Sequence, residues 1–560
     1  MRVGRSDAKR GCLLHSRLVI VNERRGKRRR RGHARVWVLT AASVIVLFAV
    51  LVGLALLSWP QLRLGADDDA LARVALPGFA GKVVTVDVRS AAGARLPVQL
   101  RQGRLWPLQK LAAGERLTAV LTVRRPGWAG WLVGYSERRR FTIETPRAHL
   151  SASWLQVKPG TAVTAAFEQP VSLVSLAGKR PRQLTSPRAV VPLGIVASGS
   201  HGAGSIEIAA AARSWERLSA PVLVSWFPWR PYPQLLTDPT PGATLAPGKL
   251  LTLTFSDSVS RLLGSRHPRL SPATPGRWRL LDTHTLAFQP GRFGFGLGAK
   301  VRVVLPQAVH IAGSSGRKLT RTLNWQVPAG STLRLQQVLA QLGWLPLSWR
   351  AKTPFVSITP KVQLATAISP PAGRFSWRYA NIPAELRNLW RPGQPNAITT
   401  GAVMMFQERH GLPVDALPGP RFWRTLIGDA IRGKFRADGY SYVYVHRDLP
   451  QSLNLWHNGR VILTSPGNTG VPAAPTELGT FPVFEHIPVG TMSGTNPNGS
   501  HYKDPGIRYI SYFHHGEAIH AFTRASFGTP QSLGCVELPL ASAAKVWPYT
   551  PIGTLVTIEN

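Results

Sequence analysis

One segment near the N-terminus restricts the chain more than any other. From Val36 to Trp59 the sequence runs for 24 residues without a charged side chain. At about 1.5 Å per helical residue, this stretch exceeds the ~30 Å hydrocarbon core of a bilayer. A cleaved signal peptide has an apolar core of only roughly 7 to 15 residues with a small-residue cleavage site behind it, and neither is evident. The segment 36–59 is therefore predicted to be an uncleaved transmembrane signal anchor.

The charges that flank this segment predict its orientation. Residues 24–35, RRGKRRRRGHAR, are strongly basic, whereas the other flank carries the three aspartates Asp67, Asp68 and Asp69. Basic residues stay preferentially on the cytoplasmic side of a membrane. The sequence therefore predicts a single-pass plasma-membrane protein with a cytoplasmic basic tail, residues 1–35, and everything after the anchor outside the membrane.

The exported part of the chain remains strongly basic. The whole chain has 68 Lys+Arg and 27 Asp+Glu, a formal net charge of +41. The first 35 residues contain 13 of the basic and 2 of the acidic side chains, which leaves 55 against 25 and a surplus of 30 beyond them. Such a surface suits an anionic polymer, here cell-wall polymers, or a membrane surface, and nucleic acid is excluded as a partner on this side. The alternative is a large exported protein that merely tolerates surface arginine.

The exported chain is too long for one hydrophobic core. About 500 residues imply roughly three or four domains. With 47 prolines and 52 glycines, short alternating runs dominate, as at Val84, Val86 and Val88, and turn residues separate them. This pattern is typical of strands. We expect a multidomain, mainly β chain with one or two β-rich modules at 75–230 and a β-sandwich resembling immunoglobulin-like modules at 231–330.

The pattern changes after Ser331. Apolar residues recur at helical spacing from Leu335 to Leu342, with Ser331 or Thr332 as the N-cap and Gly343 as the stop. Two further helical segments follow, GAVMMFQERHGL and the stretch around Trp423. These segments predict a small three-helix module.

The sequence of these helices resembles that of the peptidoglycan-binding domain. The matching stretches are LQQVLAQLGWL, AVMMFQERHGLPVDALPG and FWRTL. The resemblance spans 331–434 and is interrupted by an insertion at 348–395, where the family has a short link. It implies a module that binds cell-wall carbohydrate. A plain helical spacer is the alternative, because Leu and Phe at this spacing also serve packing.

Strand signals return from Tyr440 onward. Alternating runs on either side of Asn458 and Gly459 predict a hairpin, and TELGTFPV and ISYFHHGEAIHAF, residues 476–483 and 510–522, predict strands. The segment ends in SLGCV around Cys535. The only other cysteine is Cys12, which the anchor would leave on the cytoplasmic side, so Cys535 has no disulfide partner. An unpaired thiol in an oxidising compartment indicates wanted reactivity, here a nucleophile near His520.

The segment 440–560 resembles the catalytic domain of the L,D-transpeptidases, also called the YkuD domain. The resemblance rests on LGTFPV, then AIHAF with His520, then GTPQSLGCVELP with Cys535. It implies a mainly β catalytic fold that acts on peptidoglycan stem peptides. The implied reaction is attack of a cysteine on a tetrapeptide stem and transfer of the acyl group to an amine of a neighbouring stem, a crosslink.

The residues can be assigned roles in this chemistry. A thiol with a pKa near ~8.5 needs a neighbouring base, and His520 can act as base and then protonate the departing D-alanine amine. The amides of Gly534 and Cys535 are the natural oxyanion donors, since glycine allows close backbone approach. The resemblance implies that the carbonyl of Ala521 orients the histidine. Ser532 matches the family's Ser/Thr and is expected to shape the loop.

Three further residues are expected to contact substrate: Tyr502, Thr529 and Glu537. Tyr502 matches by position the family's tyrosine over the site and offers a third oxyanion donor. Two positions depart from the family's pattern. Leu533 replaces a frequent histidine, and Glu537 stands where arginine or asparagine is common. The charge of Glu537 is expected to favour an amine-bearing acceptor or to repel a stem carboxylate.

Other functions remain open on the sequence alone. His501, His514, His515, His520 and Cys535 are enough donors for zinc, but His514 and His515 on one strand would point to opposite faces, and HExxH and paired CxxC are absent from the sequence. We therefore expect no metal and no cofactor, and a monomer. The remaining alternatives are an L,D-carboxypeptidase or other wall cysteine hydrolase, and an inactive anchored protein that binds the wall.

Overall fold

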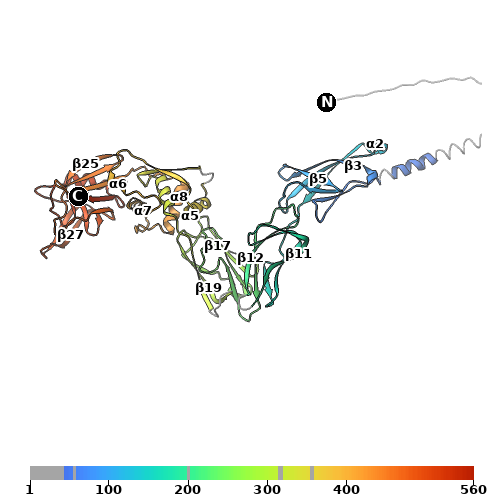
Figure 1. Ribbon diagram of the computed structural model, residues 1–560, viewed down its shortest axis with the longest axis horizontal. Coiled ribbons are helices and arrows are strands. Elements are labelled where there is room, and N and C mark those ends of the chain that lie inside the picture. Colours follow the sequence, from blue (N-terminus) through green and yellow to red (C-terminus); the bar gives the residue numbers. More distant parts are fainter. Residues whose placement is uncertain (1–42, 55–57, 199–201, 313–318, 354–357) are drawn as a thin grey trace, which may run out of the picture. The chain divides into compact units, whose positions relative to one another are not determined.

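The computed structural model describes residues 43–54, 58–198, 202–312, 319–353 and 358–560 (Figure 1). Strands dominate, and most helices lie between residues 332 and 432. The chain divides into two compact units. The first comprises Met1–His149, Phe167–Ala189 and Ala209–Pro221, and the second comprises the remaining segments to Asn560. The expectation of a mainly β, multidomain chain is confirmed.

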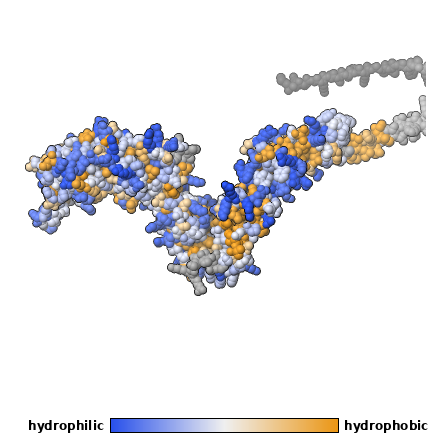
Figure 2. All heavy atoms as spheres, in the orientation of Figure 1, coloured by the Kyte–Doolittle hydropathy of each residue, from blue (hydrophilic) through white to orange (hydrophobic). Residues whose placement is uncertain are grey.

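The predicted anchor falls only partly on described residues. Residues 43–54 form a helix of apolar, mostly exposed side chains (Figure 2). In the part of the chain that the structure describes, no helix has both the length and the apolar character needed to cross a membrane. The rest of the predicted anchor, at 36–42 and 55–57, and the basic tail 1–35 lie outside the described residues.

Two small antiparallel sheets begin the first unit, with strand orders β1-β2-β6-β5 and β4-β3-β7-β8. Alternate residues of β7, RLTAVLTVR, are buried, as expected of a strand with one face on a core. Leu105 of one sheet and Leu117 and Leu121 of the other share that core. The elements are β1 (Arg63–Gly65), β2 (Ala72–Ala75), η1 (Gly78–Ala80), β3 (Lys82–Ser90), β4 (Arg95–Leu96), β5 (Val98–Arg101), β6 (Arg104–Pro107), β7 (Arg116–Arg124), α2 (Gly127–Val133) and β8 (Ser136–Glu144).

A five-stranded sheet follows, in the order β11-β10-β12-β13-β9. Its strands are β9 (Trp154–Val157), β10 (Ala162–Leu176), β11 (Arg182–Val196), β12 (Gly204–Ala211) and β13 (Val222–Pro228). The region predicted as 75–230 thus contains three sheets, and its first strand, β1, begins upstream of residue 75.

The next module, expected to be an immunoglobulin-like β-sandwich, has seven strands that hydrogen bonds connect in one continuous order. The order is β16-β19-β14-β15-β18-β17, with β20 paired to β19. Parallel pairing of β14 with the far end of β19 makes this connection. The elements are β14 (Gln234–Asp238), β15 (Leu251–Phe255), α3 (Val259–Leu263), β16 (Arg269–Ser271), β17 (Gly276–Leu280), β18 (Thr285–Pro290), β19 (Lys300–Ile311) and β20 (Leu319–Gln326).

The helical module contains more than the three predicted helices. Ser331 caps the first helix by accepting from the Arg334 amide, which satisfies one of the unpaired donors of the first turn. The predicted insertion contributes a two-stranded antiparallel sheet and two more helices. The elements are α4 (Thr332–Gln341), β21 (Leu347–Ala351), α5 (Pro360–Ile368), β22 (Gly373–Trp377), α6 (Ala384–Asn388), α7 (Ala397–Arg409) and α8 (Pro420–Arg432).

The C-terminal domain is made of two sheets, with strand orders β25-β24-β23-β31-β26 and β27-β28-β29-β30. Asn458 and Gly459, both at positive φ, close the hairpin between β24 and β25. The elements are β23 (Ser441–His446), β24 (Ser452–His457), β25 (Arg460–Pro466), β26 (Gly479–Pro482), β27 (Glu485–Thr495), β28 (His501–His514), β29 (Glu517–Ala521), β30 (Val536–Leu538), α9 (Leu540–Val546), η3 (Trp547–Tyr549) and β31 (Leu555–Glu559).

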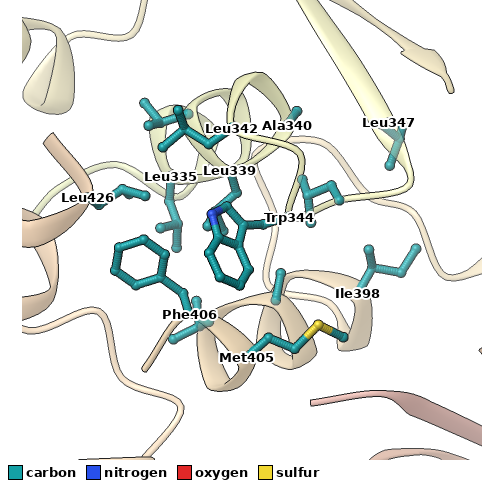
Figure 3. Close-up of a cluster of buried hydrophobic side chains, with 14 of the residues drawn as sticks. Leu335, Leu339, Ala340, Leu342, Trp344, Leu347, Ile398, Met405, Phe406 and Leu426 are labelled. Carbon is teal, nitrogen blue, oxygen red and sulfur yellow. The ribbon is translucent and has the colours of Figure 1, made fainter. Parts of the chain in front are cut away.

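The helical module and the five-stranded sheet share one hydrophobic core. Trp344 and Phe406, which lie edge to face in the helical module (Figure 3), belong to the same buried cluster as Tyr442, Trp456 and Leu555 of the sheet. The two backbones also touch, because a Cβ added at Gly401 of α7 would collide with the carbonyl oxygen of Gly553. The C-terminal domain therefore packs against the helices as one body.

Candidate active site

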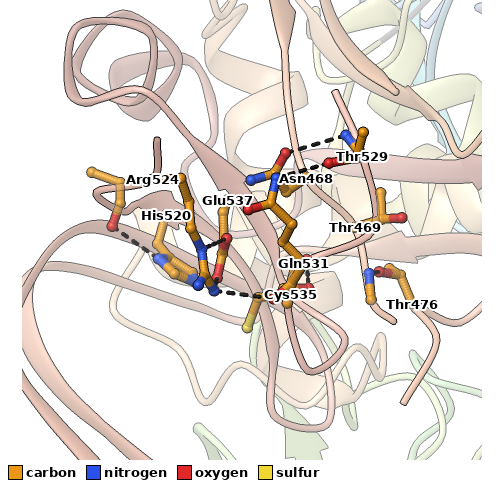
Figure 4. A network of polar contacts seen from close by, with 12 residues as sticks. Asn468, Thr469, Thr476, His520, Arg524, Thr529, Gln531, Cys535 and Glu537 are labelled. Atoms are coloured by element: carbon orange, nitrogen blue, oxygen red, sulfur yellow. Dashed lines mark hydrogen bonds and ion pairs between the residues drawn. The ribbon is translucent and has the colours of Figure 1, made fainter. Parts of the chain in front are cut away.

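The candidate nucleophile and base lie on neighbouring strands of the four-stranded sheet. β29 and β30 pair in parallel, with His520 opposite Glu537. Cys535 precedes Glu537 by two residues, and residues two apart along extended backbone face the same side. His520, Glu537 and Cys535 are therefore grouped on one side of the sheet, as Figure 4 shows.

The ring of His520 is buried and oriented by a backbone group. Only 2% of this residue is exposed, and Nδ1 lies 3.0 Å from the carbonyl oxygen of Ala521. Because a carbonyl can only accept, Nδ1 carries the proton and Nε2 keeps its lone pair. Burial lowers the pKa of His520 below its usual 6.5, since the charged ring loses hydration. The imidazole is therefore a neutral base at neutral pH.

Cys535 is a free, half-buried thiol. Burial, together with the nearby carboxylates of Glu537 and Glu517, raises the pKa of this thiol to about 12. Its Sγ lies 3.8 Å from the carbonyl oxygen of Gly516. Within the described residues, no hydrogen bond joins Sγ to the His520 ring. The resting pair is thus a neutral thiol and a neutral imidazole.

The loop that leads into Cys535 carries two backbone amides that could bind a substrate oxygen. Gly534 has φ of 103°, a conformation that side chains rarely adopt. The Oγ of Ser532 donates to the carbonyl of Cys535 at 2.6 Å and fixes the turn. Among the residues that the structure describes, the amides of Gly534 and Cys535 donate to no acceptor. Both are therefore available to a substrate oxygen.

A pocket of about 290 Å³ opens in front of these groups. Tyr502 lines it from β28, and its ring lies over Gly494 of β27. Burial raises the pKa of Tyr502, and the neighbouring Cys535 adds to the shift. The remaining lining residues include Met492, Asn496, Asp504, Ile507, Phe522, Arg524, Gln531 and Leu533. Polar and charged side chains make up most of this lining, and Met492, Ile507, Phe522 and Leu533 supply its apolar part.

Glu537, which is expected to affect substrate choice through its charge, lines the pocket as one partner of an ion pair. Its two carboxylate oxygens accept from Nη2 and Nε of Arg524 at 2.7 and 2.8 Å. The residue is only 4% exposed. The same Nη2 also donates to the carbonyl of Gln531. A bidentate pair of this kind is strong and directional, so Arg524 neutralises Glu537 and restrains the loop before Cys535.

Thr529, expected to contact substrate, lies outside the pocket and is exposed. Its hydroxyl accepts from Gln531 Nε2 at 2.8 Å. The fully buried Asn468 holds this part of the loop through Oδ1, which accepts from the amide of Gly528 at 2.9 Å. Thr529 thus belongs to the scaffold of the loop.

The histidines that a metal site would need are differently placed from the prediction. His515 has φ of 43° and lies in the turn between β28 and β29, not on a strand. Its ring lies 4.4 Å from the ring of His514, so the two do not point to opposite faces. Across the described ranges of the chain, no group of three or more His, Cys, Asp or Glu side chains is arranged to hold a metal ion.

Two residues of the site went unnoticed in the sequence, Arg524 and Asn468. Each forms a hydrogen bond to a residue that is distant in the sequence. Arg524 and Glu537 are 13 positions apart, and Asn468 and Gly528 are 60 positions apart. The one available signal was Glu537, because a buried carboxylate requires a cationic partner.

Comparison with known proteins gives one family match. Residues 429–558 match the profile described as the L,D-transpeptidase catalytic domain, YkuD. This range includes the last residues of α8. No curated protein sequence matches the chain.

Several solved structures are similar to the chain. An L,D-transpeptidase from Mycobacterium smegmatis has 12% identity and a TM-score of 0.20, covering 59% of this chain and 99% of that one. The catalytic domain of an E. faecium L,D-transpeptidase has 24% identity and a TM-score of 0.20, covering 22% and 99%. L,D-transpeptidase 3 from Mycobacterium tuberculosis has 10% identity and a TM-score of 0.20, covering 58% and 98%. These identities and TM-scores are too low to establish a common overall structure.

The family match and the site fall on the same stretch of chain. The matched range contains both strands that carry His520 and Glu537, the loop that carries Cys535, and Tyr502. Residues 429–558 are an L,D-transpeptidase catalytic domain of the YkuD type.

Proposed function

We propose that the protein is a cell-wall L,D-transpeptidase that uses Cys535 as its nucleophile. One observation carries the proposal. A free thiol and a neutral buried imidazole lie on one side of two parallel neighbouring strands and line one pocket, and two unoccupied backbone amides lie beside the thiol. This is the set of groups that acyl transfer needs: a nucleophile, a base and oxyanion donors.

The reaction begins with the stem carbonyl in the pocket. Sγ of Cys535 attacks the carbonyl carbon while Nε2 of His520 takes the thiol proton, and the oxygen becomes an oxyanion that accepts from the amides of Gly534 and Cys535. The proton then passes from His520 to the amine of the departing D-alanine as the C–N bond breaks. A thioester remains on Cys535.

The second half reverses these proton movements. An amine of a neighbouring stem attacks the thioester carbonyl and gives its proton to Nε2 of His520. The C–S bond breaks, the thiolate recovers the proton, and a new amide joins the two stems. Because burial favours the neutral forms of both Cys535 and His520, proton transfer accompanies attack and no stable thiolate precedes it. The hydroxyl of Tyr502 is the proposed third donor to the substrate.

The setting of this reaction is part of the proposal. The uncharged stretch 36–59 anchors the chain in the plasma membrane, with residues 1–35 in the cytoplasm and the catalytic domain on the wall side. The basic tail and the exposed apolar side chains of the helix at 43–54 support this topology. The helical module at 331–434 is proposed to hold cell-wall polymer, and the chain to act as a monomer. Protease added to intact spheroplasts should remove the C-terminal domain and leave residues 1–35 intact.

Acylation by a carbapenem tests the nucleophile. A catalytic domain from an E. faecium L,D-transpeptidase is described as acylated by ertapenem. The full chain incubated with ertapenem should gain one adduct, on the peptide that contains Cys535. Cys535→Ala should gain none, whereas Cys12→Ser should be labelled like the wild type. A folded wild-type protein without an adduct would overturn the proposed nucleophile.

Product analysis tests the acceptor. Disaccharide tetrapeptides incubated with the full chain should yield crosslinked dimers and free D-alanine in equal amounts. Release of D-alanine with tripeptides only would show water as the acceptor and replace the transpeptidase assignment with a carboxypeptidase. No product of either kind from a chain that is labelled by ertapenem would indicate a different acyl donor.

A further inference from the structure

An exposed aromatic patch lies at one end of the first β module. It consists of Phe79 of η1, Trp128 and Trp131 of α2, and Tyr135, each between 61% and 70% exposed. Trp128 and Trp131 are three residues apart and share one face of their helix. The two residues between them, Ala129 and Gly130, are buried, and Gly130 lies under the ring of Tyr135. The fold therefore presents two indoles to the outside.

The patch is continuous with the end of the apolar N-terminal stretch. The ring of Trp59, the last residue of that stretch, lies 5.6 Å from Trp128 and 6.5 Å from Phe79 between centroids. The helix at 43–54 precedes it in the chain, and Figure 2 shows that this helix is hydrophobic on the face in view. The exposed rings thus lie where the apolar stretch meets the folded module, and α2 is labelled at this end of the module in Figure 1.

Positive charge surrounds the patch. Lys82 begins β3 with one residue between it and η1, Arg124 ends β7 with two residues between it and α2, and Lys82 and Arg124 are cross-strand partners. Arg138 follows on β8. All three side chains are exposed, and none forms an ion pair within the described part of the chain. Like charges placed directly opposite each other destabilise a sheet, unless an anionic surface is near.

We infer that this patch docks on the headgroup layer of an anionic lipid bilayer. Tryptophan and tyrosine rings are enriched at the membrane interface, where one part of the ring is apolar and another can form hydrogen bonds. Basic side chains beside them are attracted electrostatically by an anionic leaflet. Docking holds the first module against the membrane and fixes the direction in which the rest of the exported chain departs. This inference rests on the proposed anchor, because Trp59 must lie at the bilayer surface.

Site-directed spin labelling of the full chain tests the patch. Cys12→Ser and Cys535→Ser remove the native thiols, and a nitroxide is attached at Trp131→Cys or, as a control, at Ala92→Cys. Residue 92 is exposed in the turn between β3 and β4, at the opposite end of β3 from Lys82. Both chains are reconstituted in vesicles of zwitterionic and anionic phospholipid. Power saturation then measures accessibility to oxygen and to a water-soluble nickel chelate.

The inference predicts that residue 131 is accessible to oxygen and severalfold less accessible to nickel than residue 92. Equal nickel accessibility at both positions would overturn it. Protection of residue 131 from both reagents would also overturn it, because that result indicates a protein partner such as a second copy of the chain. Flotation of the same vesicles separates failure of the anchor from failure of the patch. Chains that do not float refute the anchor, whereas chains that float with residue 131 open to nickel refute only the docking.

Discussion

The two sheets of the C-terminal domain share one core but meet different surroundings on their other faces. The five-stranded sheet packs on that core with Val443 and Leu455, and its opposite face places Tyr442 and Trp456 in the core shared with the helices. The four-stranded sheet also packs on the common core, through Ile519 and Val536. Its outer face has the pocket with His520, Cys535 and Glu537.

This difference separates support from chemistry. A sheet buried on both faces has no room for polar groups that change charge, so it can only hold position. A sheet with one open face can place polar groups beside a substrate and still be held rigidly from behind. The packed sheet should therefore control stability, and the open sheet should control reactivity.

The largest effect should come from the open sheet. His520→Asn removes the base, and proton transfer by a positioned side chain is worth about 10²- to 10⁴-fold, so crosslinking turnover should fall by that factor. Turnover of stem peptides by the full chain is the measurement. His514→Asn, in the same sheet, is the matched control and should retain most activity. Comparable losses in both variants would contradict the role of His520.

The pH dependence of Cys535 alkylation is a second test of the reactive site on the four-stranded sheet. Because the raised pKa of about 12 keeps the thiol protonated, only the small thiolate fraction reacts with iodoacetamide. Alkylation should therefore accelerate about tenfold per pH unit between about pH 7 and 10. The rate is followed by mass spectrometry in Cys12→Ser. A plateau below about pH 8 would instead reveal a thiolate–imidazolium pair.

The packed sheet should respond through stability. Gly401→Ala forces a Cβ against the carbonyl of Gly553, and overpacking of this kind costs about 1 to 3 kcal/mol. The free energy of unfolding, measured in urea, should fall accordingly. Gly428→Ala is the matched helical control, since its Cβ meets only the end of the Arg432 side chain at 3.2 Å. That variant should be unchanged or more stable by up to about 1 kcal/mol. Equal losses in both would argue against the close contact.

A smaller effect is expected from the ion pair beside the pocket. Glu537→Gln leaves Arg524 with a neutral partner, which should lower the free energy of unfolding by about 1 to 2 kcal/mol and loosen the loop before Cys535. The ion pair of the exposed Asp438 with the half-buried Arg436 supplies the control. Asp438→Asn should cost at most about 0.5 kcal/mol. Thermal unfolding of the two variants tests whether burial of Glu537 makes the difference.

The smallest effect is the pH dependence of stability from His520. Its pKa is lower in the folded chain than the usual 6.5, so the unfolded chain binds more protons between the two values. Stability from this group is complete above pH 6.5 and is lost as the pH falls below it. The slope cannot exceed about 1.4 kcal/mol per pH unit for one proton. His520→Asn should flatten this part of the stability profile, and an unchanged profile would exclude His520 as its source.

Local signals in the sequence predicted the parts of the molecule that local physics determines. Asn458 and Gly459 predicted the hairpin because both can adopt positive φ, and the alternation at Val84, Val86 and Val88 predicted β3. The unpaired Cys535 and the nearby His520 indicated the site because a lone thiol beside a base has few structural reasons to exist. That β29 and β30 pair in parallel, and so bring His520 and Cys535 to one side of the sheet, could be seen only in the structure.

Contacts between distant positions could not be predicted in this way. Arg524 gives no local pattern that pairs it with Glu537, and the effect of Glu537 on substrate was therefore considered from its own charge alone. The turn at His515 breaks a run of residues that alternates well enough to suggest one continuous strand. The contact of Gly401 with Gly553 joins two segments whose own periodicities say nothing about each other.

The close approach of Gly401 and Gly553 also limits how the gene can be rearranged. A cut between the helical module and the first strand of the catalytic segment would leave Tyr442 and Trp456 without the side chains that cover them. Such a fragment would expose a large apolar surface and tend to aggregate. Recombination should therefore exchange the helices and the catalytic segment together, and a β module further upstream is the more permissive point for insertion or loss.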